Sequence, residues 1–164
     1  MNDLITNLKN FLNEERFQHS LNVADVAVHL AKKHGVSFEK AEIAGLLHDC
    51  AKEQDLSIWH AKTSAELAQK HFGVNDPEIL QAIRSHTMGN ENMTLLDKII
   101  FVADFIEPSR DFDGVDEIRE MAEKNLDKAV VLVMASTLQY LINNRKFICV
   151  DTIKSWNAVT KKDV

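Results

Sequence analysis

The sequence predicts an all-α protein that folds as a single helical bundle. Only 5 Gly and 2 Pro occur among 164 residues, too few chain breaks for a protein built of many short strands. Long segments instead repeat their apolar residues at helical spacing. No repeat, linker or low-complexity run divides the chain, so we expect residues 1–164 to form one domain with a sizeable core.

In the first half of the chain, four helices are expected with short breaks between them. Apolar residues mark a short helix within residues 4–12 and a longer one across residues 17–31. The longer helix should stop at Gly35, because glycine readily adopts the left-handed conformation that ends many helices. Ser37 can then cap a third helix, and a fourth ends near residues 71–73.

Two further helices have clear start signals. Residues 76–78 read Asp-Pro-Glu, which supplies a capping side chain, a proline at the first helical position and an acidic first turn. The helix that follows reaches His86. Thr94 and Asp97 have the spacing of a capping box, with Asp in place of the usual Glu. We therefore expect another helix over residues 95–106.

The C-terminal third predicts two more helices. One covers residues 126–141, and the last follows residues 151–152. The β-branched run at residues 130–133 is also compatible with a buried strand, but the residues on both sides of it favour a continuous helix. Residues 145–150 are ambiguous between loop and extended chain.

Charge and composition exclude some classes of partner. The net charge of −6 argues against nucleic acid, which requires a basic face, but it is compatible with a small polyphosphate held by a metal ion and a few arginines. No apolar stretch approaches the roughly 20 residues that span a bilayer, and the N-terminus lacks the features of a secretory signal. Cys50 and Cys149 form no disulfide framework, so we expect a cytoplasmic protein with no membrane partner.

A histidine and an aspartate stand where an apolar helix ends. His48 and Asp49 directly follow the apolar run at residues 41–47, and neither side chain is easily buried without a partner. His19 lies in the apolar helix before them, and Asp104 interrupts a later apolar helix. Two imidazoles and two carboxylates on three helices of a bundle suit Fe, Mn, Co, Ni or Zn. The pattern therefore predicts a divalent metal site at His19, His48, Asp49 and Asp104.

Several cationic side chains are suited to line a pocket beside this metal. Arg16 lies one helical turn before His19, and Arg110 follows the helix that carries Asp104. Arginine binds phosphate through paired donors, and Lys52 is a further candidate cation. His60 and His86 stand at helix junctions and are candidates for a second metal or for phosphate contacts. Taken singly, each of these residues is equally compatible with an ordinary surface position.

Five segments of the chain resemble one known family, and the resemblance extends over nearly the whole chain. The histidine–aspartate pair and its partners are similar to the metal site of the HD-domain metal-dependent phosphohydrolases. Within that superfamily, the segments resemble the bacterial YqeK-type proteins. The segments are RFQHSLNV at 16–23, LLHDCAK at 46–52, AIRSHT at 82–87, LLDKIIFVAD at 95–104 and IEPSRDFDGVDEIR at 106–119.

The resemblance implies an HD-domain bundle that hydrolyses diadenosine tetraphosphate symmetrically to two ADP by metal-activated water. Its iron ligands correspond to His19, His48, Asp49 and Asp104. Its nucleotide contacts correspond to Arg16, His60, His86, Thr87 and Arg110. In the resulting mechanism, Asp49 accepts a proton while His60 or His86 protonates the leaving phosphate, which makes these three residues the catalytic candidates.

The chain departs from the family pattern near one wall of the expected pocket. The segment between Lys52 and Trp59 is shorter than the family pattern. Residues 61–65 read Ala-Lys-Thr-Ser-Ala, where family members tend to read Ala or Gly followed by Pro-Val-Gly-Ala. Both departures lie close to His60 and leave the metal set untouched.

The sequence leaves other functions open. One is an HD phosphohydrolase that acts on nucleoside mono- or triphosphates, and another is a nucleotide-binding module whose metal is structural. A second metal is left undecided, and a second copy of the chain, in a homodimer, is a candidate partner besides ADP or a dinucleoside polyphosphate.

Overall fold

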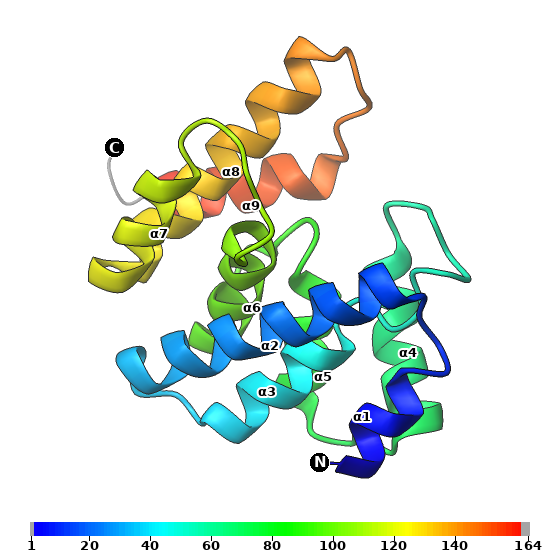
Figure 1. The fold of residues 1–164 in the computed structure, drawn as a ribbon. Helices are drawn as coiled ribbons and strands as arrows, with labels where there is room; N and C mark the ends of the chain where they lie inside the picture. Colours follow the sequence, from blue (N-terminus) through cyan, green and yellow to red (C-terminus); the bar gives the residue numbers. More distant parts are fainter. Residues whose placement is uncertain (1, 162–164) are drawn as a thin grey trace.

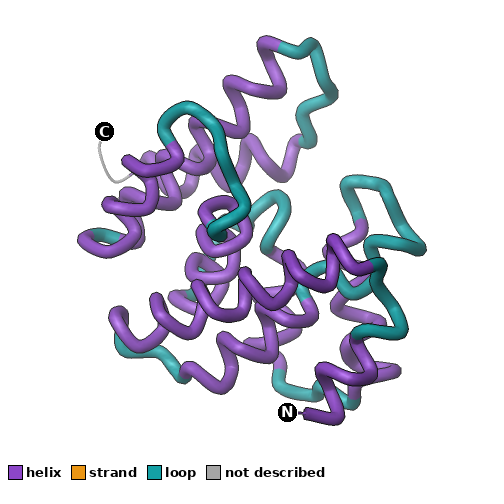
Figure 2. The backbone as a smooth tube through the Cα atoms, in the orientation of Figure 1, coloured by secondary structure: helices purple, strands orange, loops and turns teal. Residues whose placement is uncertain are grey.

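The computed structural model describes residues 2–161, and this part of the chain is made of helices and loops without a strand (Figures 1 and 2). The all-α prediction is confirmed. The helices are α1 (Asn2–Leu8), α2 (Glu14–His34), α3 (Phe38–Leu47), α4 (His60–Phe72), α5 (Pro77–Ser85), α6 (Leu95–Ile106), α7 (Val115–Lys124), α8 (Leu126–Asn143) and α9 (Val150–Thr160).

Helix α6 runs through the middle of the bundle (Figure 1). It packs against α2, α3 and α5 on one side and against α7 and α8 on the other. Its sequence explains this place, because Ile99, Ile100, Val102 and Ala103 are all fully buried. Helix α2 lies along α3, and α9 folds back on α8. One continuous hydrophobic core therefore holds the helix ends that carry the polar candidates.

The predicted helix boundaries follow local capping chemistry. Gly35 ends α2 in the left-handed region at φ 74°, as expected for a glycine in this position. The side chains of Ser37 and Asp76 cap α3 and α5. Thr94 and Asp97 form both hydrogen bonds of a capping box at the start of α6. The β-branched run at residues 130–133 is helical and lies within α8.

Two details differ from the sequence-based expectations, and the structure resolves one segment that was left ambiguous. The first helix ends at Leu8 rather than near residue 12, because Phe11 and Leu12 turn inward to pack on the core. Residues 145–149 form a loop. Helix α7 has no counterpart in the predictions, because only Val115, Ile118 and Ala122 are buried in an otherwise charged segment. Among the described residues, no helix has the length and apolar character needed to cross a membrane.

Candidate metal centre

Three helices bring the predicted metal ligands together. His19 projects from the middle of α2, His48 and Asp49 follow the end of α3, and Asp104 lies in the last turn of α6. His19 Nε2 lies 3.0 Å from Asp104 Oδ1 and 3.2 Å from His48 Nε2. His48 Nε2 lies 3.8 Å from both Asp104 Oδ1 and Asp49 Oδ2. The four side chains therefore present their nitrogen and oxygen atoms to one small volume.

A second group of ligand atoms adjoins the first through Asp49. Its Oδ1 atom lies 3.1 Å from His60 Nε2 and 3.2 Å from His86 Nε2. His60 begins α4 and His86 directly follows α5, and the two Nε2 atoms are 3.1 Å apart. The hydroxyl oxygen of Thr87 lies 3.1 Å from His60 Nε2. The structure thus places all these sequence-predicted residues at one centre.

Backbone carbonyls orient three of the four imidazole rings. The Nδ1 atom of His48 donates to the carbonyl of Gly45 at 2.7 Å. The Nδ1 atoms of His60 and His86 donate in the same way to Ser57 and Ile83, at 2.7 and 2.8 Å. A carbonyl oxygen only accepts hydrogen bonds, so the proton of each neutral ring lies on Nδ1. The Nε2 lone pairs are left facing the centre, as in metal-ligating histidines.

The arrangement of acceptors fits a divalent cation. Asp49 Oδ1 is buried and has no hydrogen-bond partner, although it lies between two imidazole nitrogens. With both rings neutral and protonated on Nδ1, the Nε2 lone pairs of His19 and His48 would face and repel each other at 3.2 Å and would also face Asp104 Oδ1. A positive charge between these atoms removes the repulsion, and the mixed nitrogen and oxygen donors suit a transition metal. Two groups meet the spacing needed to hold an ion: His19, His48 and Asp104, and His48, Asp49 and His86.

The protonation states favour the same conclusion. Burial lowers the pKa of His48 from 6.5 to about 4, so the ring is neutral at pH 7, as a ligand must be. Burial also lowers the pKa of His19, but the hydrogen bond to Asp104, the negative charge of Asp104 and the hydrogen bond to Glu107 together outweigh burial and raise this pKa above its usual value of 6.5. Burial alone raises the pKa of the Asp49 and Asp104 carboxyl groups, but the surrounding histidines outweigh burial and hold both pKa values well below their usual range.

A buried glutamate supports the first group and was not among the predicted residues. Glu107 is fully buried at the end of α6, and its Oε1 lies 3.2 Å from His19 Nδ1. Its Oε2 accepts from Asn22 at 3.0 Å and from the backbone N–H of Ser109 at 2.8 Å, and the Ser109 hydroxyl also donates to this carboxylate. One sequence signal was available, because Glu107 follows Asp104 by three residues and so lies on the same side of α6.

A cationic pocket opens onto the centre. It has a volume of about 360 Å³, and its lining includes His19 and Asp49 together with Arg16, Lys52 and Arg110. Arg110 donates to Asp104 Oδ1 at 2.9 Å, and Lys52 Nζ lies 2.7 Å from His60 Nε2. Arg16 Nε pairs with Glu53 at 2.8 Å. The two predicted arginines therefore lie at the mouth of the metal site, within the same pocket.

A larger aromatic groove continues from the same centre between α6 and α8. It has a volume of about 790 Å³ and starts at Asp104 and Arg110. Phe105 and Phe112 line the groove and contact each other edge to face, with 5.0 Å between their ring centroids. Tyr140 also lines the groove and is half exposed. Cys50 belongs to neither space: burial raises the pKa of its thiol to about 12, and its Sγ donates to the Ser64 carbonyl.

The chain is similar to known proteins over the residues that form this centre. The HD domain family model matches residues 16–109, which include the four predicted metal ligands His19, His48, Asp49 and Asp104. The symmetrical bis(5'-nucleosyl)-tetraphosphatase of Bacillus subtilis is 37% identical, with 92% of each chain covered. The protein of the same name from Staphylococcus aureus is 35% identical, covering 94% of this chain and 92% of the relative.

A solved structure extends the comparison to the whole fold. It is a predicted HD superfamily hydrolase involved in NAD metabolism from Clostridium acetobutylicum. The two structures have a TM-score of 0.93 and 38% sequence identity, over 99% of this chain and 97% of the other.

Proposed function

The chain belongs to the HD domain family and, within it, to the symmetrical bis(5'-nucleosyl)-tetraphosphatases, and we propose that it hydrolyses diadenosine tetraphosphate to two molecules of ADP. One observation carries the proposal at the level of the site. The pocket lined by Arg16, Lys52 and Arg110 shares His19 and Asp49 with the candidate metal centre. Clustered cations beside a divalent metal suit a chain of phosphates, and they do not suit an uncharged substrate.

The metal in this proposal is iron, with Mn, Co, Ni and Zn as alternatives, held by His19, His48, Asp49 and Asp104. Such an ion supplies Lewis-acid activation of water at neutral pH and offsets phosphate charge. The side chains of the chain do the remaining work. Arg16, Lys52 and Arg110 bind the phosphate oxygens and stabilise the charge that spreads over them during the reaction.

Two kinds of proton transfer are needed, and different residues suit them. Asp49 Oδ1 lies at the centre beside the Nε2 atoms of His60 and His86, and in our proposal this oxygen accepts the proton of the attacking water. The imidazoles of His60 and His86 lie on the other side of Oδ1 and are suited to protonate or orient the leaving phosphate. Thr87 is suited to hold a phosphate oxygen beside His60. Attack at an inner phosphorus then leaves one ADP on each side of the broken bond.

The aromatic groove between α6 and α8 suits the base of one nucleotide. Phe112 and Tyr140 offer faces for stacking, and the groove begins at Arg110, which would hold the adjoining phosphates. The cytoplasm is the compartment that we propose for the reaction, because both cysteines are unpaired.

Product analysis tests the function directly. We expect ADP as the single nucleotide product from diadenosine tetraphosphate, with ¹⁸O from labelled water in one of each two ADP molecules. Release of AMP with ATP, or of inorganic phosphate, would contradict symmetrical cleavage. A panel of nucleoside mono- and triphosphates is the matched comparison, because turnover of those compounds alone would favour the other phosphohydrolase activity.

A further inference from the structure

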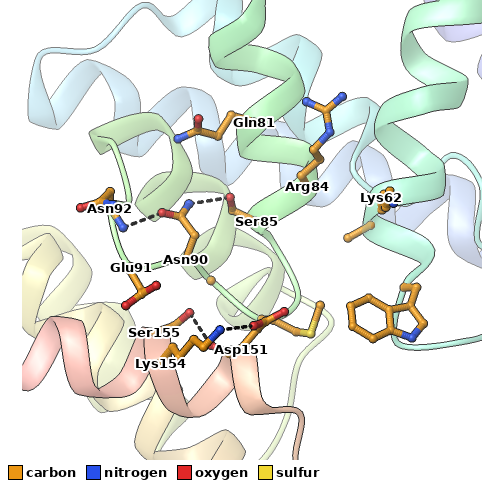
Figure 3. A pocket seen from close by; sticks show the side chains of 14 residues that line it. Lys62, Gln81, Arg84, Ser85, Asn90, Glu91, Asn92, Asp151, Lys154 and Ser155 are labelled. Atoms are coloured by element: carbon orange, nitrogen blue, oxygen red, sulfur yellow. Dashed lines mark hydrogen bonds and ion pairs between the residues drawn. The ribbon is translucent and has the colours of Figure 1, made fainter.

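A separate pocket lies beside the histidine pair, on residues that the proposed mechanism does not use. Its volume is about 520 Å³, in the range of small-molecule sites. It lies among α4, α5, the loop after α5 and α9, and Figure 3 draws its lining side chains and labels most of them. None of its lining residues is shared with the cationic pocket at Arg16 and Arg110.

The chain connects this pocket to the catalytic centre at three points. Trp59 precedes His60, Ser85 precedes His86, and Met88 follows Thr87. The histidines turn their rings inward to Asp49, whereas their neighbours in sequence line the pocket. The segments that carry His60, His86 and Thr87 therefore contribute both to the lining of this pocket and to the catalytic centre.

The lining combines an exposed aromatic face with unpaired cations. The Trp59 side chain is 48% exposed, although a tryptophan normally buries most of its surface. Lys62 and Arg84 lie on the same side of the pocket, across from Glu91 (Figure 3). Within residues 2–161, neither Lys62 nor Arg84 forms an ion pair. Lys154, on the α9 side, is already paired with Asp151 at 3.4 Å.

An indole face with two free cations beside it is suited to a nucleotide. A base can stack on Trp59 while its phosphates pair with Lys62 and Arg84. The proposed reaction requires such a place, because symmetrical cleavage leaves an identical nucleotide on each side of the broken bond. The groove at Arg110, with the rings of Phe112 and Tyr140, is the place proposed above for one of the two. We propose that the pocket lined by Trp59, Lys62 and Arg84 binds the second nucleotide half of the substrate, an inference that rests on the proposed function.

The first experiment counts binding sites for the product. Calorimetry of the manganese-loaded protein with ADP should give two sites per chain, one for each half. Trp59→Ala should lose one of them or weaken it at least about fivefold, and Trp59→Phe should restore it, because a phenyl ring still stacks. Phe147→Ala, which removes an exposed ring outside the pocket, should keep both sites. A single ADP per wild-type chain, or two unweakened sites in Trp59→Ala, would overturn the inference.

Steady-state kinetics tests the same pocket with the intact substrate. Lys62→Ala and Arg84→Ala should each raise the KM for diadenosine tetraphosphate about tenfold or more, with kcat changed much less. Lys70→Ala is the matched control, since Lys70 is also exposed on α4 but lies at its other end. An unchanged KM in both pocket variants overturns the inference. Absence of turnover by the wild-type enzyme instead rejects the proposed function, and the ADP count separates the two failures.

Discussion

The Nε2 atoms of His60 and His86 face each other at 3.1 Å, with Asp49 Oδ1 beside both. Each ring donates from Nδ1 to a backbone carbonyl, so two neutral rings would direct their lone pairs at the same point. The ammonium of Lys52, 2.7 Å from His60 Nε2, supplies a positive charge beside the pair, and Thr87 adds a hydroxyl at 3.1 Å. Polar groups gathered in this way favour the role that we propose for the pair in the reaction over a place in the hydrophobic core.

Loss of one member of this pair should separate catalysis from metal binding. We expect His86→Ala to lower kcat by about 10²- to 10⁴-fold, the usual contribution of a general acid or base. Metal held by His19, His48 and Asp104 should remain, because that group does not include His86. Metal analysis and turnover of the same preparation check this result, with the exposed His29→Ala as control. If the variant lost its bound metal as well as its activity, His86 would be a primary ligand.

The first ligand group should behave in the opposite way. His48→Ala and Asp104→Asn are expected to lose bound metal and activity together. The first removes the nitrogen that lies 3.2 Å from His19 Nε2, and the second removes the negative charge of the carboxylate that lies 3.0 Å from it. Arg110→Ala should keep the metal but weaken ADP binding about tenfold, since a charged hydrogen bond is worth roughly 1.5–3 kcal/mol. Metal content and ADP calorimetry distinguish the two classes. Normal turnover by metal-free His48→Ala would refute the mechanism.

Glu107 should control metal affinity without touching the metal. Its carboxylate accepts from His19 Nδ1 and so directs Nε2 toward Asp104. Glu107→Gln keeps the shape of the side chain but removes its charge, and we expect the metal affinity to fall about 10- to 100-fold. Calorimetric titration with Mn²⁺ measures the loss, while circular dichroism should show unchanged helix content. Glu123→Gln, at an exposed glutamate, is the control, and equal affinities in the two variants would contradict the role of Glu107.

The parts of this protein that depend on local chemistry could be predicted from its sequence. The capping residues Ser37, Asp76 and Thr94 act within three residues of themselves, so their helix starts were predictable. His48 and Asp49 were conspicuous because an imidazole and a carboxylate at the end of an apolar helix are hard to bury without partners. Glu107 was not predictable as the partner of His19, because 88 positions separate the two in sequence and only the packing of α2 against α6 joins them. The pocket at Trp59 and Arg84 depends on tertiary packing in the same way.

The segment before α4 should show a pH dependence of its own. Hydrogen bonds from Ser57 and Thr63 lower the pKa of Asp55 from 3.8 to about 2. A lowered pKa in the folded state means that the ionised carboxylate stabilises the fold. This stabilisation is complete above about pH 4 and is lost as the pH falls through about 2. The Tm difference between wild type and Asp55→Asn, measured on metal-free protein, should therefore shrink over this range. A Tm difference that does not change with pH would contradict the lowered pKa of Asp55.

The close approach of α2 and α3 sets the spacing of His19 and His48, and Gly45 makes it possible. A Cβ atom at Gly45 would lie 2.7 Å from Ala24 Cα and 3.0 Å from Ala24 N, which are backbone atoms that cannot turn aside. We expect Gly45→Ala to push the helices apart at a cost of about 1–3 kcal/mol, measured by urea denaturation. The carbonyl of Gly45 also accepts from His48 Nδ1, so the same shift should displace this ligand and lower the metal affinity.

Gly73→Ala is the control that separates the effect of Gly45→Ala on stability from its effect on metal affinity. Gly73 adopts φ 68° at the end of α4, and a Cβ there meets nothing within 4 Å. The variant should lose about 1–2 kcal/mol through backbone strain alone and keep the metal affinity of the wild type. If Gly45→Ala likewise kept its metal affinity while losing stability, the contact between α2 and α3 would serve the core and not the metal centre.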